Sequence, residues 1–146
     1  MLLGLATSAA AQGGPVDPAT VRGCVTEACV GDAATACMAA TEGGGTTVGM
    51  NGCLDAEGAV WDAILNEEYA RLRSEAEAVP PGPSDYRLAD GLRDMQRAWI
   101  AFRDAACGFR AAIYRGGTIM STVTYDCLLR ETARQAMSLR ETEIAR

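Results

Sequence analysis

The run from Pro80 to Pro83 (PPGP) most constrains how this chain can fold, because it separates two long segments that each have helical periodicity. Proline lacks the backbone N–H that a helix interior needs, so a helix that arrives here must end. Upstream, apolar residues recur at three- and four-residue steps from about 49 to 79. Downstream, Ser84 can cap a second helix that begins at Asp85 and runs to about 114. Two helices of similar length joined by a tight turn are expected to lie antiparallel.

A third helix and a short cysteine-rich segment complete the expected fold. Gly116 or Gly117 supplies a left-handed stop for the second helix, and residues 121–124 can cap a third helix that runs to about 144. The segment 21–41 has three cysteines and many alanines, which favours one or two short helical turns. The expected fold class is all-α: a small disulfide-stapled helical bundle with a long antiparallel helix pair, a third C-terminal helix and a short cysteine-rich N-terminal helical segment.

The same periodicity predicts which side of each helix is buried. On the first helix the predicted inward stripe consists of Leu54, Trp61, Ile64, Leu65, Leu72 and Ala76. On the second helix it consists of Met95, Trp99, Phe102 and Ala106. On the third helix one possible inner face is formed by Leu128, Thr132, Gln135 and Leu139.

The chain has six cysteines, an even number that predicts three disulfides in a small exported protein: Cys24, Cys29, Cys37, Cys53, Cys107 and Cys127. None has C-x-x-C spacing and histidine is absent, so no metal site is expected. Cys53, Cys107 and Cys127 are expected at the same end of the bundle. The spacing leaves several pairings open. The favoured set joins 107 to 127, 37 to 53 and 24 to 29, and the alternative, 53 to 107, would lock the first helix against the second.

The N-terminus indicates export. Residues 1–11 have the short apolar stretch and the Ala9-x-Ala11 site of a secretory signal peptide, although the usual positive leader is missing. Residues 12–20 have the Gly/Pro content of a flexible lead-in, and residues 21–146 are expected to form a single helical domain. No apolar run reaches the roughly 18 residues that cross a bilayer. The expected location is periplasmic or secreted.

Composition restricts the possible chemistry. All 13 basic residues are arginine, and without histidine or lysine there is no Ser-His-Asp triad, Cys-His pair or Schiff base. The 19 acidic residues are scattered among arginines, as in the spacing of Asp126 and Arg130, which is typical of solvated helix faces. We therefore expect no enzyme, no catalytic residue and no cofactor; a carboxylate-dependent glycosidase is the remaining catalytic alternative. The net charge of −6 disfavours nucleic acid and favours a cationic partner.

Several groups of residues occur in a distinctive order between about 50 and 140. The first is Met50-x-x-Cys53, Glu57, Trp61-Asp62 and Leu65-Asn66-x-x-Tyr69. The second is Leu92, Gln96-Arg97-Ala98-Trp99, Phe102-Arg103-Asp104 and Cys107. The third is Tyr114-x-Gly116-Gly117-Thr118, followed by Cys127, Thr132 and Arg134. In these groups the chain resembles the LprI-like lysozyme inhibitor family of the bacterial envelope, of the N-terminal-domain type.

The resemblance implies an exported, helical, disulfide-stapled module whose partner is a protein, lysozyme or a related cationic cell-wall hydrolase. The candidate contact residues are Tyr114, Gly116, Gly117 and Thr118 in the turn after the second helix, with Asp104 and Asp126 as nearby acids. Because Arg103 and Asp104 are adjacent on a helix, each is expected to find its own partner. The alternative function is a periplasmic structural or scaffolding module with no inhibitory activity.

Overall fold

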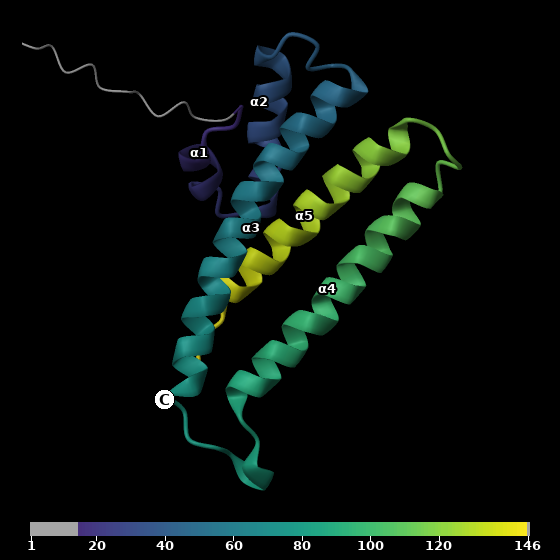
Figure 1. Ribbon diagram of the computed structural model, residues 1–146. Coiled ribbons are helices and arrows are strands. Elements are labelled where there is room, and N and C mark those ends of the chain that lie inside the picture. Colours follow the sequence, from purple (N-terminus) through teal and green to yellow (C-terminus); the bar gives the residue numbers. More distant parts are fainter. Residues whose placement is uncertain (1–14, 146) are drawn as a thin grey trace, which may run out of the picture.

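The computed structural model describes residues 15–145, which form helices and no strand (Figure 1). The elements are α1 (Pro18–Arg22), the 3-10 turn η1 (Glu27–Cys29), α2 (Asp32–Ala40), α3 (Thr47–Glu77), the 3-10 turn η2 (Pro83–Asp85), α4 (Leu88–Ala112) and α5 (Ile119–Glu141). Three disulfides cross-link them. The expected all-α, disulfide-stapled helical bundle is confirmed.

The three long helices form the body of the molecule. α3 and α4, joined by the proline-rich turn, run antiparallel as expected, and α5 runs in the same direction as α3 (Figure 1). The closest packing, however, is between α3 and α5, whereas α4 lies mainly against α5 and touches α3 less. The reason is the distribution of buried side chains, because eight residues of α5 are buried but only three of α4.

The core lies between α3 and α5 and is completed by the N-terminal segment. All six residues of the predicted α3 stripe are buried, and Trp61 and Ile64 are almost completely enclosed. On α5, Thr132 and Leu139 are buried as expected, whereas Leu128 and Gln135 are only partly covered. The remaining buried positions of α5 are Cys127, Leu129, Glu131, Ala133, Ala136 and Met137.

The predicted inner face of α4 is wrong for two of its four residues. Trp99 packs against the core, but Met95 is 42% exposed and Phe102 is 60% exposed. The side chains of α4 that are buried instead are Gln96, Cys107 and Ala111. Leu92 and Trp99 are the large apolar residues of α4 that reach the core, whereas Met95 and Phe102 lie on a side of the helix that α5 does not cover.

The N-terminal segment is fastened to α3 by a disulfide and by a buried carboxylate. Cys37 of α2 is bonded to Cys53 of α3. The side chain of Glu57, which is 1% exposed, accepts hydrogen bonds from the backbone N–H groups of Gly31 (2.8 Å) and Ala34 (2.7 Å). Gly31 is the N-cap residue of α2 and Ala34 lies in its first turn. Their N–H groups have no partner within the helix, so the carboxylate satisfies them and fixes this end of α2 to α3.

The beginning of the chain differs in part from the expectation. The proposed signal peptide, residues 1–11, lies outside the described residues. Val16 is buried and α1 begins at Pro18, so packed structure begins within the 12–20 segment that the sequence assigns to a lead-in. In the part of the chain that is described, no helix combines the length and the apolar character needed to span a bilayer.

The connection from α3 to α4 is longer than expected. Ser84 and Asp85 both adopt positive φ angles (60° and 57°) within η2, so Ser84 does not cap α4. The helix begins instead at Leu88, with Arg87 as the residue before its first turn. The proline-rich stop is therefore located correctly, but the second helix starts three residues later than predicted.

Candidate binding surface

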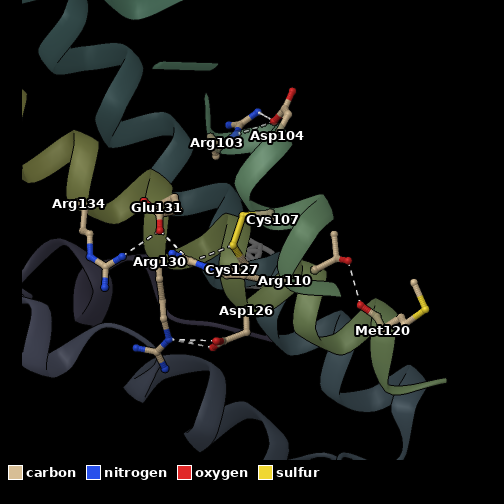
Figure 2. The surroundings of a disulfide bond; sticks show 11 residues. Arg103, Asp104, Cys107, Arg110, Met120, Asp126, Cys127, Arg130, Glu131 and Arg134 are labelled. Carbon is tan, nitrogen blue, oxygen red and sulfur yellow. Dashed lines mark hydrogen bonds and ion pairs between the residues drawn. A yellow bond between two sulfur atoms is a disulfide. The ribbon is translucent and has the colours of Figure 1, made fainter. Parts of the chain in front are cut away.

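The candidate site is the turn between α4 and α5, and a disulfide lies directly beneath it. Cys107, about a turn and a half before the end of α4, is bonded to Cys127 in α5, with Cα atoms 5.5 Å apart (Figure 2). Both residues are buried. The other two disulfides are Cys24–Cys29 and Cys37–Cys53, so the pairing is the one that the sequence favoured. The bond closes the chain from 107 to 127 into a short constrained loop.

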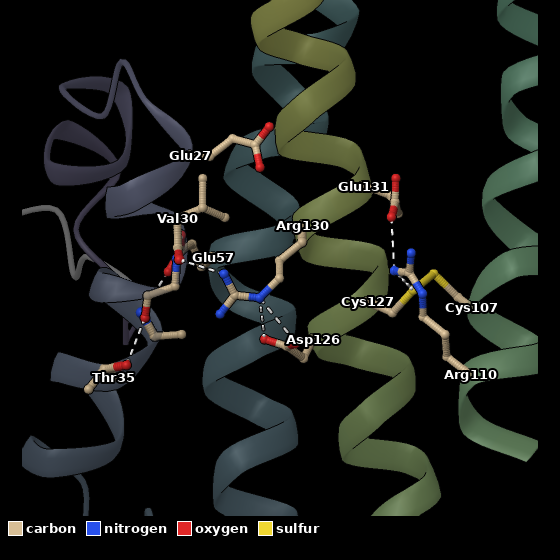
Figure 3. Close-up of polar contacts among 12 residues, drawn as sticks. Glu27, Val30, Thr35, Glu57, Cys107, Arg110, Asp126, Cys127, Arg130 and Glu131 are labelled. Carbon is tan, nitrogen blue, oxygen red and sulfur yellow. Dashed lines mark hydrogen bonds and ion pairs between the residues drawn. A yellow bond between two sulfur atoms is a disulfide. The ribbon is translucent and has the colours of Figure 1, made fainter. Parts of the chain in front are cut away.

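An ion-pair network next to the disulfide adds a second attachment between α4 and α5. Arg110 of α4 donates to Oε1 of Glu131 (2.9 Å) and lies 3.2 Å from Sγ of Cys127 (Figure 3). Arg134 donates to the same Glu131 oxygen (3.0 Å) and to Glu27 of η1 (2.9 Å). The hydrogen bond from Arg134 to Glu27 raises the pKa of the guanidinium, which stays charged. Glu131 is almost fully buried and joins α4 to α5 through Arg110, and Arg134 extends the network to the N-terminal segment through Glu27.

The turn itself is exposed. Tyr114 is 51% exposed, and the residues from Arg115 to Thr118 are exposed as well. Gly116 has φ +94°, the left-handed conformation predicted for the helix stop, which side chains other than glycine rarely adopt. The backbone N–H of Met120 donates to the carbonyl of Gly117 (3.0 Å), which closes the start of α5 onto the turn.

The far side of the turn is fixed to α3. The side-chain amide of Asn51 donates to Oγ of Ser121 (2.9 Å) and accepts from Oγ1 of Thr122 (2.8 Å). These two bonds join the first turn of α5 to the first turns of α3. The exposed turn is therefore held by the disulfide on one side and by Asn51 on the other, so little conformational freedom would be lost on binding.

The two acidic candidates do not converge with the turn. Asp104 pairs with the adjacent Arg103 (2.8 Å), contrary to the expectation of separate partners, because the long arginine side chain reaches across to its neighbour. Asp126 pairs with Arg130 (3.0 Å), which also donates to the carbonyl of Val30 (3.1 Å). Figures 2 and 3 show that Asp126 lies on the side of α5 that faces the N-terminal segment, while Arg103 and Asp104 project from α4. Both acids already have a cationic neighbour.

A groove between α3 and α4 is not predicted from the sequence. Two adjoining hollows of about 280 and 520 Å³ meet at Asp62 and Arg103, and residues of α5 such as Leu128 and Thr132 form the floor of the smaller one. The guanidinium of Arg103 lies 5.1 Å from the centre of the Trp99 ring, a cation–π contact within this groove. Residues that carry the family resemblance line the larger hollow: Asp62, Asn66, Tyr69, Gln96, Arg97, Trp99 and Arg103.

The sequence did contain a signal for the groove. Asp62, Asn66 and Tyr69 are spaced by four and three residues on α3, and Gln96, Trp99 and Arg103 are spaced by three and four on α4. Each set therefore lies on one side of its helix. The two sides face one open space because α5, and not α4, fills the core beside α3. In residues 15–145, no three side chains of the metal-binding types are grouped as a metal site.

The chain is similar to a known family and to an uncharacterized relative. The family model described as "Lysozyme inhibitor LprI" matches residues 37–139. An uncharacterized protein of Rhizobium meliloti (strain 1021) is 29% identical over 97 residues, which covers 63% of this chain and 70% of the relative. No solved structure matches the chain. The matched region contains α3, α4, the exposed turn and nearly all of α5.

Proposed function

The chain belongs to the LprI lysozyme inhibitor family, and from this premise we propose that it is an extracytoplasmic protein that binds lysozyme or a related cationic cell-wall hydrolase and blocks it. The three disulfides support a location outside the cytoplasm, because such bonds persist in oxidising compartments. The chain has no histidine or lysine, which supports binding over catalysis.

The observation that carries the proposal is the exposed turn at Tyr114 to Thr118, held by the Cys107–Cys127 disulfide and by Asn51. An inhibitor gains affinity when its contact loop is already ordered, because the entropy cost of fixing the loop is small. A tyrosine on such a loop provides a large contact area with few rotatable bonds. The turn therefore enters the active-site cleft of the hydrolase in this proposal.

The charge of the protein supports a cationic target. The net charge is −6, and long-range attraction to a positively charged enzyme would raise the rate of encounter. Asp104 and Asp126 are paired with arginines, so the attraction in this proposal comes from the whole surface and not from these two acids.

The direct test is an inhibition assay. The purified, oxidised protein is titrated against a lysozyme that clears a suspension of bacterial cell walls, and the lysis rate is expected to fall in proportion to dose. An unchanged lysis rate at high molar excess, together with no retention on immobilised lysozyme, would contradict the proposal for that enzyme and would favour the structural or scaffolding role.

A steric probe then tests the turn itself. A side chain at Gly117 has room, since its Cβ would lie 3.7 Å from the nearest atom and its φ is not in the left-handed region. Gly117→Arg is therefore expected to fold normally but to abolish inhibition by obstructing the contact. The matched control is Gly52→Arg, which adds the same group to an exposed glycine of α3 with nothing within 4 Å. Equal inhibition by both variants would exclude the turn as the contact.

A further inference from the structure

Four arginines line the larger of the two hollows between α3 and α4, which has a volume of about 520 Å³: Arg73, Arg93, Arg97 and Arg103. Every residue of this lining belongs to α3 or α4, so the two helices form its walls (Figure 1). Volumes of roughly 300–1,000 Å³ are typical of sites for small molecules. Among the described residues, Asp62 is the single acid of the lining, so the hollow is cationic although the protein has a net charge of −6. We call it the arginine hollow.

One of the four arginines, Arg97, has no partner in the described part of the chain, where it makes neither an ion pair nor a hydrogen bond. The acids that pair with the other three lie outside the lining: Glu77 pairs with Arg73, Asp90 and Asp94 with Arg93, and Asp104 with Arg103. A guanidinium has five N–H donors in a planar fork that matches the two oxygens of a carboxylate. Arg97 therefore offers a complete set of donors to an anion in the hollow.

A buried amide in the same lining has an unused donor group. Gln96 is 8% exposed, and its Oε1 accepts from Nε2 of Gln135 in α5 (3.0 Å). Its own Nε2 donates to no residue from 15 to 145. No fully enclosed side-chain nitrogen or oxygen of the described chain lacks a partner, so this Nε2 reaches open space, which the arginine hollow provides. Because buried amides normally have partners for both of their groups, the unused donor points to a ligand.

The other polar groups of the lining indicate what else the ligand must carry. Asp62 accepts one hydrogen bond, from Nδ2 of Asn66 (3.2 Å), and has capacity to accept more. A ligand beside it therefore needs hydroxyl or amide donors as well as a negative charge. Trp99 and Tyr69 also line the hollow, and in residues 15–145 neither the indole N–H nor the phenol hydroxyl makes a hydrogen bond. Each ring combines an apolar surface with an unused polar group.

We propose that the arginine hollow binds a sugar acid, which is a pyranose unit with a free carboxylate, such as a uronic acid. Arg97 and Nε2 of Gln96 donate to the carboxylate, and Asp62 accepts from the hydroxyl groups. The C–H bonds of the sugar ring pack against Trp99 and Tyr69. An inorganic anion would give Asp62 no donor and would leave the aromatic side chains unused. A neutral sugar would give Arg97 no charge with which to pair.

This site goes beyond the proposed inhibitory function and does not depend on it. The arginine hollow lies between α3 and α4, and none of its lining residues belongs to the exposed turn at 114–118. Binding of a sugar acid is measured with the protein alone, whereas inhibition is measured by lysis in the presence of lysozyme. Failure of either proposal therefore leaves the other standing.

The first test is calorimetric titration of the full, oxidised protein with D-glucuronate, and with D-glucose as the matched sugar that lacks the carboxylate. Glucuronate is expected to bind with a millimolar or lower dissociation constant, at least about tenfold more tightly than glucose. Lactate and inorganic phosphate report the binding of an anion alone. No saturation by glucuronate up to about 20 mM, or equally tight binding of glucose, lactate or phosphate, would overturn the proposal.

A second titration identifies the source of the sugar acid. A trimer of galacturonate is compared with the monomer, because a hollow that continues into its smaller neighbour at Asp62 and Arg103 has room for a chain. Tighter binding of the trimer would support the site and assign it to an acidic polysaccharide. Equal or weaker binding of the trimer would support the site and assign it to the free sugar. Binding of neither would overturn the proposal.

A variant then tests the residue that pairs with the carboxylate. Arg97→Gln is expected to weaken glucuronate binding about tenfold, because it removes a charged donor. It should fold normally, since Arg97 is exposed and has no partner among the described residues. The control, Arg87→Gln, makes the same change at an exposed arginine just before α4 and outside the lining, and should bind normally. Equal affinity of the two variants would overturn the proposal.

Heteronuclear NMR spectra locate the bound sugar. Glucuronate should shift the side-chain amide signals of Gln96 and the indole signal of Trp99, both of which line the hollow. The indole signal of Trp61, whose side chain is 0% exposed, and the signals of the turn at 114–118 should stay in place. Shifts that occur in the turn and not in the lining would overturn the assignment of the site.

Discussion

At the scale of single residues, Glu57 has the most demanding environment in the molecule. Its carboxylate is buried and accepts from the N–H groups of Gly31 and Ala34 and from Nε1 of Trp61 (3.2 Å). Carboxylates that accept several hydrogen bonds at a helix N-terminus stabilise that terminus strongly. The same residue thus joins α2, the loop before it and the largest side chain of the core.

Glu57→Gln is expected to lower the free energy of unfolding by about 2–3 kcal/mol, because the new amide group points a donor at a backbone N–H that then has no acceptor. Urea unfolding with the disulfides intact measures this change. Asp62→Asn serves as the control, since it makes a similar change further along α3 at an exposed side chain. A loss below about 1 kcal/mol for Glu57→Gln would show that the buried carboxylate contributes little.

The pair formed by Arg22 and Glu67 predicts a pH effect on α1. Two hydrogen bonds of 2.8 Å join the side chains, and the hydrogen bond from Arg22 lowers the pKa of Glu67. A carboxyl whose pKa is lower in the folded state stabilises the fold above its unfolded pKa, and this contribution disappears as the pH falls through the folded value.

Protection of the α1 amides against hydrogen exchange should therefore decrease on acidification through the range below the ordinary glutamate pKa. In Glu67→Gln the protection of α1 should be lower at neutral pH and should lose this acid-range dependence. Both side chains are largely exposed, so the change is local and global stability should hardly move. A native-like pH profile in Glu67→Gln would assign the effect to another group.

At the scale of elements, periodicity located the helices but not the side on which α4 packs. The apolar spacing of α3 identified its buried face correctly, because α3 is enclosed by α5 and by the N-terminal segment. On α4 the same spacing selected Met95 and Phe102, which are exposed. Periodicity detects an apolar side of a helix, but it does not distinguish a side that faces the chain's own core from one that faces another molecule.

The attachment of α4 depends on few contacts, which predicts how it opens. With only three buried residues, α4 is held to α5 by the Cys107–Cys127 disulfide, the Arg110–Glu131 ion pair and the Gln96–Gln135 hydrogen bond. Replacing both Cys107 and Cys127 by serine should cost about 3 kcal/mol by the chain-entropy model. Amide exchange should accelerate in α4 before α3.

The control is replacement of Cys24 and Cys29 by serine, because that disulfide joins residues only five positions apart and should contribute less. Uniform acceleration of exchange in all three long helices of the Cys107 and Cys127 variant would contradict the local opening and would indicate global unfolding instead.

At the scale of the whole molecule, the sequence predicted the fold class and the long helices and favoured, among several open pairings, the disulfides that are observed, but it did not predict the groove. Cys107 and Cys127 were expected at one end because the helix lengths place them there. The groove at Asp62 and Arg103 depends on the distance between α3 and α4, which is set by the packing of α5 against α3. The proline-rich turn predicts antiparallel neighbours and does not fix that distance. The spacing of residues along one helix does not determine the distance between two helices.

The overall charge leads to the last prediction, which applies to the proposed complex with lysozyme. Attraction between a protein of net charge −6 and a cationic enzyme accelerates encounter at low salt, and dissolved ions screen it over a distance of about 10 Å at 0.1 M. The association rate constant should therefore fall about tenfold when the ionic strength rises from roughly 0.02 to 0.3 M, while the dissociation rate changes little.

Replacing Glu141 and Glu143 by glutamine removes two exposed charges at the end of α5 distant from the turn. This variant should associate more slowly and depend less on salt, with unchanged dissociation. Surface plasmon resonance over a salt series measures both rate constants. An association rate constant that does not change with salt would show that the net charge does not accelerate the encounter with lysozyme.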